Sequence, residues 1–426
     1  MRISSHISLS KILKSIVLGV VLCAQFSCKS AHSREVKTKY KEVTAKDILG
    51  NPKYSAICYG GYRQNSRDIQ PTTEEVKEDL RILSALNIKV IRTYNVHLAE
   101  ASTVLKAIQE LKKEDANFEM YVMLGAWIDC KNAWTNQEPN HFEESERNEV
   151  EIKEAVRLAN QYPDIIKILA VGNEAMVKWA TSYFVQANVI LKWVNHLQNL
   201  KKENKLDQNL WITSSDDFAS WGGLDESYKT KDLEALVNAV DYVSMHTYPY
   251  HNSHYNPNFW KVPANEASFS EIEKVNAAMN RSVEFAKNQY NTVKNYVRSI
   301  NPSKPIHIGE TGWASNSDGF YGNEGSKASD EYKQASYYKA MRNWTDKEGI
   351  SCFFFEAFDE PWKDSGNPKG SENHFGLITV DGKVKFALWE NSFSLKSLKR
   401  NGNSIVKTFN GSEELLMKTV QIPPSH

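Results

Sequence analysis

Two glutamates end apolar, strand-forming stretches of this chain, and their surroundings suit a reactive carboxylate pair. Glu174 closes the string Val171-Gly172-Asn173-Glu174, and Glu310 stands in Ile308-Gly309-Glu310-Thr311-Gly312-Trp313. The apolar residues before each Glu predict a buried strand, so each carboxylate is expected at the carboxyl end of its strand. Two facing carboxylates can cleave a glycosidic bond, one as general acid and the other as nucleophile or base. Taken alone, either Glu could instead cap a helix or pair with a neighbouring Arg.

Such a pair needs parallel strands that bring distant residues to one edge, and the chain supplies them. The expected strands are Ser55–Gly60, Val90–Tyr94, Tyr121–Trp127, Ile168–Glu174, Leu210–Ser214, Tyr242–Tyr248, Pro305–Glu310 and Ser351–Phe358. The amphipathic stretches between them include Thr73–Leu86, Ala99–Lys113, Arg147–Gln161, Val185–Lys202 and Ser282–Ile300. This alternation predicts an α/β fold, a (β/α)8 TIM barrel, in which strands four and seven face one another across the mouth. A doubly wound open sheet is the alternative, but the sequence has no Gly-rich nucleotide loop to accompany it.

The composition gives no reason to expect a nucleic-acid partner. Lys+Arg and Asp+Glu each number 52 in 426 residues, so the formal net charge is zero. The sequence has no Gly-x-Ser-x-Gly elbow and no phosphate loop, so esterase and kinase chemistry lack support. Aromatic residues are plentiful, and a pyranose ring packs well on an aromatic plane.

Two long segments directly follow strands and are expected to shape a substrate cleft. They are 129–146 and 249–278, both rich in Trp, His, Asn and Pro. Two or three of the tryptophans near strand ends should form sugar platforms; the candidates are Trp127, Trp134, Trp179, Trp221, Trp260 and Trp362. Trp313, three residues after Glu310, could form the floor of the sugar site. The string 214–217 could equally cap a turn or contact sugar.

Neither the histidines nor the cysteines indicate a metal site. His246, His251 and His254 lie close in sequence, but their spacing matches no common zinc pattern, so contacts with sugar are the better interpretation. Cys58 and Cys352 stand in apolar strand runs and are expected in the core, and no C-x-x-C occurs. No metal or organic cofactor is expected.

The first 28 residues are typical of an export signal. Basic residues precede the apolar stretch 16–22, which is too short for a permanent membrane-spanning helix. Gln25-Phe26-Ser27-Cys28 resembles a bacterial lipoprotein processing site with Cys28 as the lipidated residue, although Phe26 replaces the usual Leu. We expect an exported protein anchored to a membrane by this lipid, in the periplasm or at the cell surface; a secreted soluble protein is the alternative. Residues 29–45 would be a tether, 46–398 the barrel and 399–426 a polar tail.

Several strings together resemble glycoside hydrolase family 17, which contains β-1,3-glucanases, lichenases and some glucan transglycosylases. They are Cys58-Tyr59-Gly60, Val171-Gly172-Asn173-Glu174, His246-Thr247-Tyr248-Pro249, Gly309-Glu310-Thr311-Gly312-Trp313, Phe355-Glu356-Ala357-Phe358-Asp359-Glu360-Pro361-Trp362-Lys363 and His374-Phe375-Gly376. The likeness covers nearly the whole barrel, and the string that begins at Phe355 is the most specific.

The resemblance implies a role for each matching residue. Glu174 would be the acid/base and Glu310 the nucleophile of a retaining mechanism, with the carboxyls about 5–5.5 Å apart. Tyr248 would donate a hydrogen bond to Glu310, although it could simply fill the barrel interior. Tyr59 and Asn173 would line the cleavage subsite. Of the charged residues after strand eight, Glu356 and Lys363 would bind sugar, while Asp359 and Glu360 could pair with other charges.

The sequence thus predicts a retaining glycosidase that cleaves laminarin-like β-1,3-glucan. A transglycosylase, in which an acceptor sugar outcompetes water, would share its fold and site. A glycan-binding surface lipoprotein with an inactive barrel is the rival from another class, but a pure binder needs no acid and nucleophile together. Hydrolysis or transfer, and endo or exo action, are not readable from the residues.

Overall fold

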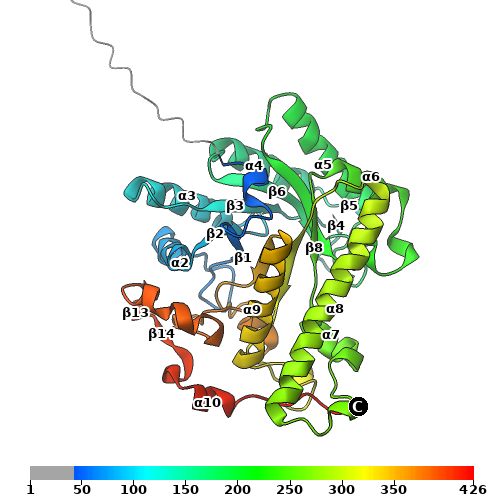
Figure 1. Cartoon of the computed structure of the whole chain (residues 1–426). Helices are drawn as coiled ribbons and strands as arrows, with labels where there is room; N and C mark the ends of the chain where they lie inside the picture. The colour runs from blue at the N-terminus through cyan, green and yellow to red at the C-terminus, as the bar shows by residue number, and fades with distance from the viewer. Residues whose placement is uncertain (1–42) are drawn as a thin grey trace, which may run out of the picture. The chain divides into compact units, whose positions relative to one another are not determined.

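The computed structural model describes residues 43–426, which form a closed parallel barrel surrounded by helices (Figure 1). Hydrogen-bonded neighbours follow the order β1-β10-β9-β8-β7-β6-β3-β2, which returns to β1. The barrel strands are β1 Ser55–Cys58, β2 Ile88–Arg92, β3 Tyr121–Ala126, β6 Ile166–Asn173, β7 Trp211–Asp217, β8 Val243–His246, β9 Ile306–Gly312 and β10 Cys352–Phe355. The TIM barrel expected from the sequence is confirmed, and each of the eight expected strands is present.

The helices pack their apolar stripes on the outside of the barrel. They are α1 Ala45–Ile48, α2 Thr73–Ala85, α3 Ala99–Glu114, α4 Arg147–Gln161, α5 Ala187–Lys202, α6 Lys231–Ala239, α7 Pro249–Tyr255, α8 Glu271–Ile300, α9 Glu331–Glu348 and α10 Glu413–Met417. At α2, the Thr72 side chain accepts from the Glu75 amide, and the Glu75 side chain accepts from Thr72 in return. This capping box explains why the helix begins where the sequence predicts it. No helix within residues 43–426 is both long and apolar enough to cross a membrane.

The two long segments after β3 and β8 carry more structure than loops. Residues 129–146 include an antiparallel hairpin of β4 Cys130–Lys131 and β5 Asn140–Glu144. The segment 249–278 begins as α7, and its last residues belong to α8, which starts eleven residues before the expected Ser282. A capping box between Ser270 and Glu273 fixes this early start, and the sequence analysis overlooked that pair.

The segment 399–426, expected as a polar C-terminal tail, packs on the rest of the domain. Arg400 is fully buried, and its guanidinium pairs with Asp79 of α2 at 2.8 Å. Short strands tie the segment to the residues before it: β14 Val406–Lys407 pairs with β11 Lys383–Val384, and β12 Lys399–Arg400 pairs with β13 Asn403–Ser404. Although the segment is polar in composition, its Arg400 side chain is neutralised inside the domain.

The expected core cysteines are in the core. Cys58 and Cys352 are buried and free, as is Cys130. The export signal, the lipidation site at Cys28 and most of the expected tether lie outside the described residues.

Candidate active site

Glu174 follows the carboxyl end of β6, and Glu310 stands in the last half of β9. The chain leaves the regular strand at Glu174, because Gly172 has a φ of 81° and Glu174 a φ of 47°, in the left-handed region. The Glu174 amide still donates to the Ser215 carbonyl at 3.0 Å, so the turn remains tied to β7. Holding a non-glycine residue in this conformation is costly, and such strain is concentrated at functional sites.

Glu310 is buried and held as a carboxylate by three hydrogen-bond donors. Tyr248 donates to Oε1 at 2.6 Å, while Tyr94 and the Arg92 guanidinium donate to Oε2 at 2.8 and 3.0 Å. Burial would raise the pKa of Glu310, but its interactions with His246 and the Arg92 guanidinium and the hydrogen bonds from the two phenols lower it below the usual value. The hydrogen bond expected from Tyr248 is present, and the Arg partner considered for Glu310 is Arg92.

Glu174 has the opposite electrostatic environment. Burial, and then the negative charge of Glu310, raises the pKa of Glu174 to about 8. Oxygen atoms of the two carboxyls lie within 4.8 Å of one another. Separations near 5 Å are typical of retaining glycosidases, whereas inverting enzymes need about 6.5–9.5 Å to admit a water. The pair therefore combines a protonated acid with an ionised neighbour at the distance of a covalent mechanism.

His246 links the two carboxyls without adding charge near neutral pH. Burial lowers the pKa of His246 to about 4, so the ring is neutral. Its Nε2 lies 3.2 Å from Nη1 of Arg92, and an Arg can only donate, so Nε2 accepts. The neutral ring then carries its proton on Nδ1, which lies 3.0 Å from Glu174 Oε1. His246 thereby orients the acid.

Glu174, His246 and Glu310 are also the side chains in the described chain that come close enough to share a metal ion. Arg92 already hydrogen-bonds to both His246 and Glu310, so a positive charge occupies the place where a cation would bind. This arrangement fits a metal poorly.

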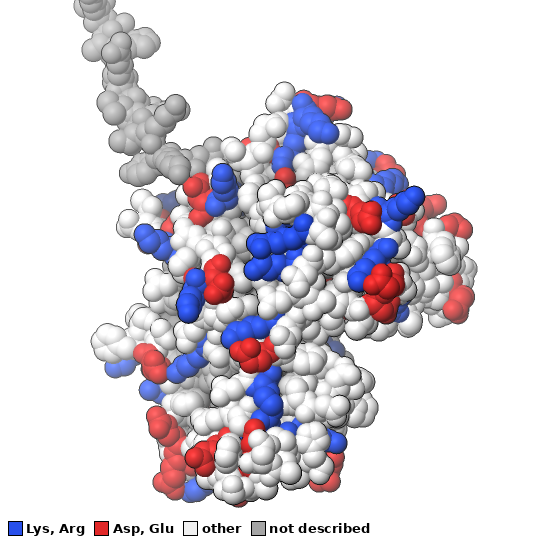
Figure 2. All heavy atoms as spheres, turned by 45° about the vertical axis from the view of Figure 1, so that its right-hand side comes forward, with Lys and Arg blue, Asp and Glu red and all other residues white. Residues whose placement is uncertain are grey.

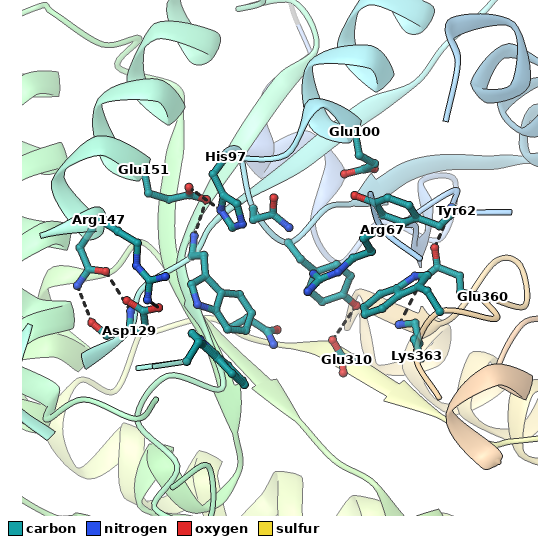
Figure 3. Close-up of a pocket in the computed structure, with 18 of the residues that line it drawn as sticks. Tyr62, Arg67, His97, Glu100, Asp129, Arg147, Glu151, Glu310, Glu360 and Lys363 are labelled. Carbon is teal, nitrogen blue, oxygen red and sulfur yellow. Dashed lines mark hydrogen bonds and ion pairs between the residues drawn. The ribbon is translucent and has the colours of Figure 1, made fainter. Parts of the chain in front are cut away.

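A cleft crosses the mouth of the barrel and passes Glu310. One half, a cavity of about 570 Å³, is lined from the loops after β1, β2, β3 and β10 and includes Asn173 (Figure 3). The other half, of about 830 Å³, is lined from the loops after β6 to β10 and includes Glu174 and Tyr248. Glu310 and Phe355 border both halves. The carboxyl pair thus lies mid-way along a cleft rather than at the end of a pocket.

The half that contains Asn173 has the features of a sugar-binding groove. The Asn173 oxygen accepts from Arg92 at 2.5 Å, which leaves its NH₂ group for a ligand. Trp127 and Trp134 border the cleft, and Tyr183 stacks on Trp134 with ring centroids 5.1 Å apart. Buried polar atoms in the lining have no protein partner: Glu100 Oε1, Asp129 Oδ1 and Trp362 Nε1. Unpaired buried polar atoms beside aromatic faces suit a ligand with many hydroxyls.

The other half offers a different set of side chains around the acid. Trp179 is 62% exposed on its wall, near Asp217 and His251. His251 faces Glu372 at 3.6 Å. Of the tryptophan candidates, Trp127, Trp134, Trp179 and Trp362 line the cleft, while Trp221 and Trp260 are fully buried.

Three expected site residues do not contact the cleft. Trp313 is fully buried and donates to the Ala328 carbonyl at 2.8 Å, so it packs behind β9 and forms no sugar floor. Tyr59 is buried and its hydroxyl donates to Asp79, on the side of the barrel wall that faces α2. Glu356 is buried as well, and it supports Lys363 at 3.3 Å; Lys363 itself lines the cleft. Successive side chains along a strand point to opposite faces, so a residue close in sequence to a cleft residue can point away from the cleft, as these three do.

Arg92 and Tyr94 are the residues that sequence reasoning missed. Both stand at the end of an apolar run, Val90-Ile91-Arg92-Thr93-Tyr94, which is the same signal that marked Glu310. A charged side chain that ends a buried barrel strand should have been a candidate on that basis alone.

The comparisons with known proteins agree with this geometry. A family model for the BtgE/BtgC glycoside hydrolase domain matches residues 56–376. The chain belongs to this family. The crystal structure of an endo-laminarinase from Formosa Hel1_33_131 is similar, with 61% identity, a TM-score of 0.89, and coverage of 90% of this chain and 98% of that one. The likeness to family 17 and the assignment as a glycosidase are confirmed.

Two more distant proteins are also similar to this chain. A probable glucan endo-1,3-beta-glucosidase, btgC, of Aspergillus flavus is 25% identical over 359 residues, which are 80% of this chain and 44% of that protein. The chain therefore spans less than half the length of this curated relative. A glycoside hydrolase family 17 β-1,3-glucanosyltransferase from Rhizomucor miehei has 18% identity and a TM-score of 0.52, and covers 79% of this chain and 96% of that one. At that identity the likeness supports the fold alone.

Proposed function

We propose that this family member cleaves laminarin-like β-1,3-glucan at internal bonds, with retention of configuration. The observation that carries the proposal is the contrast between Glu174, whose pKa is raised to about 8, and Glu310, whose pKa is lowered, within 4.8 Å of one another. The name of the 61% identical Formosa enzyme, endo-laminarinase, supports the substrate.

In this mechanism Glu310 attacks the anomeric carbon while Glu174 protonates the departing glycosidic oxygen. Tyr94, Tyr248 and Arg92 keep Glu310 ionised until it attacks, and the glycosyl–enzyme bond then forms on its carboxylate. Glu174, now deprotonated, takes a proton from water, and the resulting hydroxide displaces Glu310. The Asn173 amide lines the cleft and is placed to contact the sugar bound on the Glu310 side, while the buried Arg92 holds Asn173 and Glu310 in position.

The position of the general acid indicates which half of the cleft would bind the leaving part of the glucan chain. A general acid protonates the leaving group, so the half lined by Glu174 would hold the leaving sugar and the half lined by Asn173 the sugar that becomes attached to Glu310. A cleft that continues to both sides of the pair admits a chain at an internal bond, which favours endo action.

The test is a time course on laminarin with the product lengths resolved. A spread of short oligosaccharides from the first minutes supports an endo-acting hydrolase, and a single short product would contradict it. Products longer than the substrate fragments would identify transfer to an acceptor sugar. Binding without any cleavage would refute the enzymatic proposal.

We also propose that the protein is exported and acylated at Cys28, on the strength of the sequence pattern alone. Cells grown with labelled palmitate should incorporate label into the wild-type protein and not into Cys28→Ala. Label in both proteins, or in neither, would contradict the anchor.

A further inference from the structure

A second cavity lies at the amino ends of the barrel strands, away from the cleft. It measures about 540 Å³ and is lined by the last half of α8, the end of α9 and the start of β9. His307 at the start of β9 borders this cavity, whereas Glu310, further along the same strand, borders the cleft. The two cavities therefore open at opposite ends of the barrel.

Positive side chains dominate this cavity. Lys287, Lys294 and Arg298 of α8 line it together with Lys304, against the single carboxylate of Glu348. Figure 2 brings forward the side on which α8 lies and shows lysine and arginine side chains gathered near the middle of that face. Lys287 pairs with Glu284 at 2.6 Å, but within residues 43–426 Lys294, Arg298 and Lys304 form no ion pair.

The spacing of these cations is unfavourable for the helix itself. Lys287, Lys294 and Arg298 fall at i, i+7 and i+11 and so share one face of α8. Lys294 and Arg298, four residues apart, repel one another. The helix dipole favours Arg298 in the last turn, but it gives no stabilisation to Lys287 and Lys294, which lie further from the end. Helix stability alone therefore does not account for the basic face.

The surroundings of the cavity resemble a surface that meets a membrane. Trp344 and Tyr290 line it beside the cations, with Lys287 Nζ 5.9 Å from the Trp344 ring and Lys294 Nζ 5.8 Å from the Tyr290 ring. Aromatic and basic side chains together are typical of the level of lipid headgroups. Lys304 is held at the edge of the cavity because its ammonium donates to the carbonyls of Asn238 and Val240, and burial lowers its pKa.

The cavity also adjoins the part of the domain where the described chain begins. The amide of Gly50, just after α1, donates to Ser351 Oγ at 2.9 Å, and the neighbouring residues Gly349 and Ile350 line the cavity. The first described residues of the chain thus lie at the same end of the barrel as the basic cavity.

We propose that the basic cavity binds phosphate headgroups of an anionic membrane and so holds the barrel with its cleft facing away from the lipid. Coulomb attraction supplies the affinity, and the separation of the two cavities along the barrel keeps the cleft open to a soluble polysaccharide. Headgroup binding needs no acyl chain, and it would act together with the acyl anchor proposed at Cys28.

The test compares sedimentation of the full chain with two kinds of vesicle. One is phosphatidylcholine alone, and the other contains roughly one-third phosphatidylglycerol, whose negative surface attracts basic segments. Wild-type protein should bind the anionic vesicles more tightly, and the difference should shrink in high salt. The variant Lys287→Gln/Lys294→Gln/Arg298→Gln should bind them about 100-fold more weakly, from the usual attraction of each cation near such a surface.

A matched variant separates a site from general charge. Lys231→Gln/Lys396→Gln/Lys399→Gln removes three exposed lysines elsewhere and changes the net charge equally, so it should bind like wild type. All three proteins carry the same N-terminal segment, so its own affinity for lipid cancels, and laminarin cleavage verifies that each is folded. Equal loss in both variants, or equal binding of wild type to the two vesicles, would overturn the proposal.

Discussion

Replacement of Tyr248 by Phe tests the electrostatic account of the nucleophile directly. The Tyr248 hydroxyl donates to Glu310 Oε1 at 2.6 Å, and the substitution removes that oxygen alone. A hydrogen bond to a charged group contributes about 1.5–3 kcal/mol. At about 1.36 kcal/mol per pKa unit, its loss should raise the pKa of Glu310 by roughly one to two units.

The sign of the effect on activity follows from the role of Glu310. The carboxylate must be ionised to attack, so kcat/KM falls as the pH drops through its pKa. A raised pKa moves this acid limb to higher pH. The fall of kcat/KM at high pH, the basic limb of the profile, follows deprotonation of Glu174, whose pKa is about 8. The substitution should not move this basic limb, because Glu310 is fully charged in that pH range.

The assay is the pH dependence of kcat/KM on laminarin for wild type, Tyr248→Phe and Tyr250→Phe. Tyr250 is fully buried and hydrogen-bonds to Ser329 rather than to Glu310, so its variant controls for the loss of a tyrosine hydroxyl near the site. An acid limb that is unchanged in Tyr248→Phe, or that shifts equally in both variants, would refute the reasoning. A shift of the basic limb alone would mean that the roles of the two glutamates are reversed.

Further substitutions probe the remaining parts of the mechanism and the fold. Glu310→Ala should abolish turnover, and with azide it should yield an α-glycosyl azide from a β-linked substrate with a good leaving group; a β-azide would contradict its role as nucleophile. Glu174→Ala should spare substrates with excellent leaving groups, and equal loss on activated and natural substrates would exclude it as the acid. Trp134→Ala should raise KM for long oligosaccharides about fivefold, from about 1 kcal/mol of lost stacking, without changing kcat. Phe142→Ala, on the same hairpin but outside the cleft, should leave KM unchanged, and a matching rise there would refute the platform. Arg400→Met should lower the free energy of unfolding by about 3–5 kcal/mol in urea titration, and a loss below 1 kcal/mol would show that Asp79 is neutralised by Arg63 alone.

The barrel and the carboxyl pair could be predicted from the sequence because both depend on local patterns of residues. A buried strand leaves a continuous apolar run, and a Glu that ends such a run is conspicuous, as Glu174 and Glu310 are. Their hydrogen-bond partners depend on which strand tips meet across the mouth. Tyr248 could be predicted as a partner of Glu310 because it belongs to a family motif. Arg92 and Tyr94 belong to none of the matching strings, so their hydrogen bonds to Glu310 are visible only in the structure.

Other features depend on contacts between distant segments, which no local pattern encodes. Trp313 and Tyr59 adjoin site residues in sequence but point away from the cleft, because strand geometry sends successive side chains to opposite faces. The polar composition after residue 398 was compatible with an exposed tail, and only the ion pair of Arg400 with Asp79 shows that it belongs to the domain.

That ion pair also bears on the order in which the chain can fold during synthesis. β1 pairs with β10, so the first barrel strand lacks one neighbour until residue 355 has been made. Asp79 then stays buried with an incomplete set of cations until Arg400 emerges. Contacts that span most of the chain close late and at high entropic cost. A ribosome-bound or truncated chain that ends before residue 400 should therefore remain open to proteases and chaperones, and the barrel should become resistant only when its last residues are released.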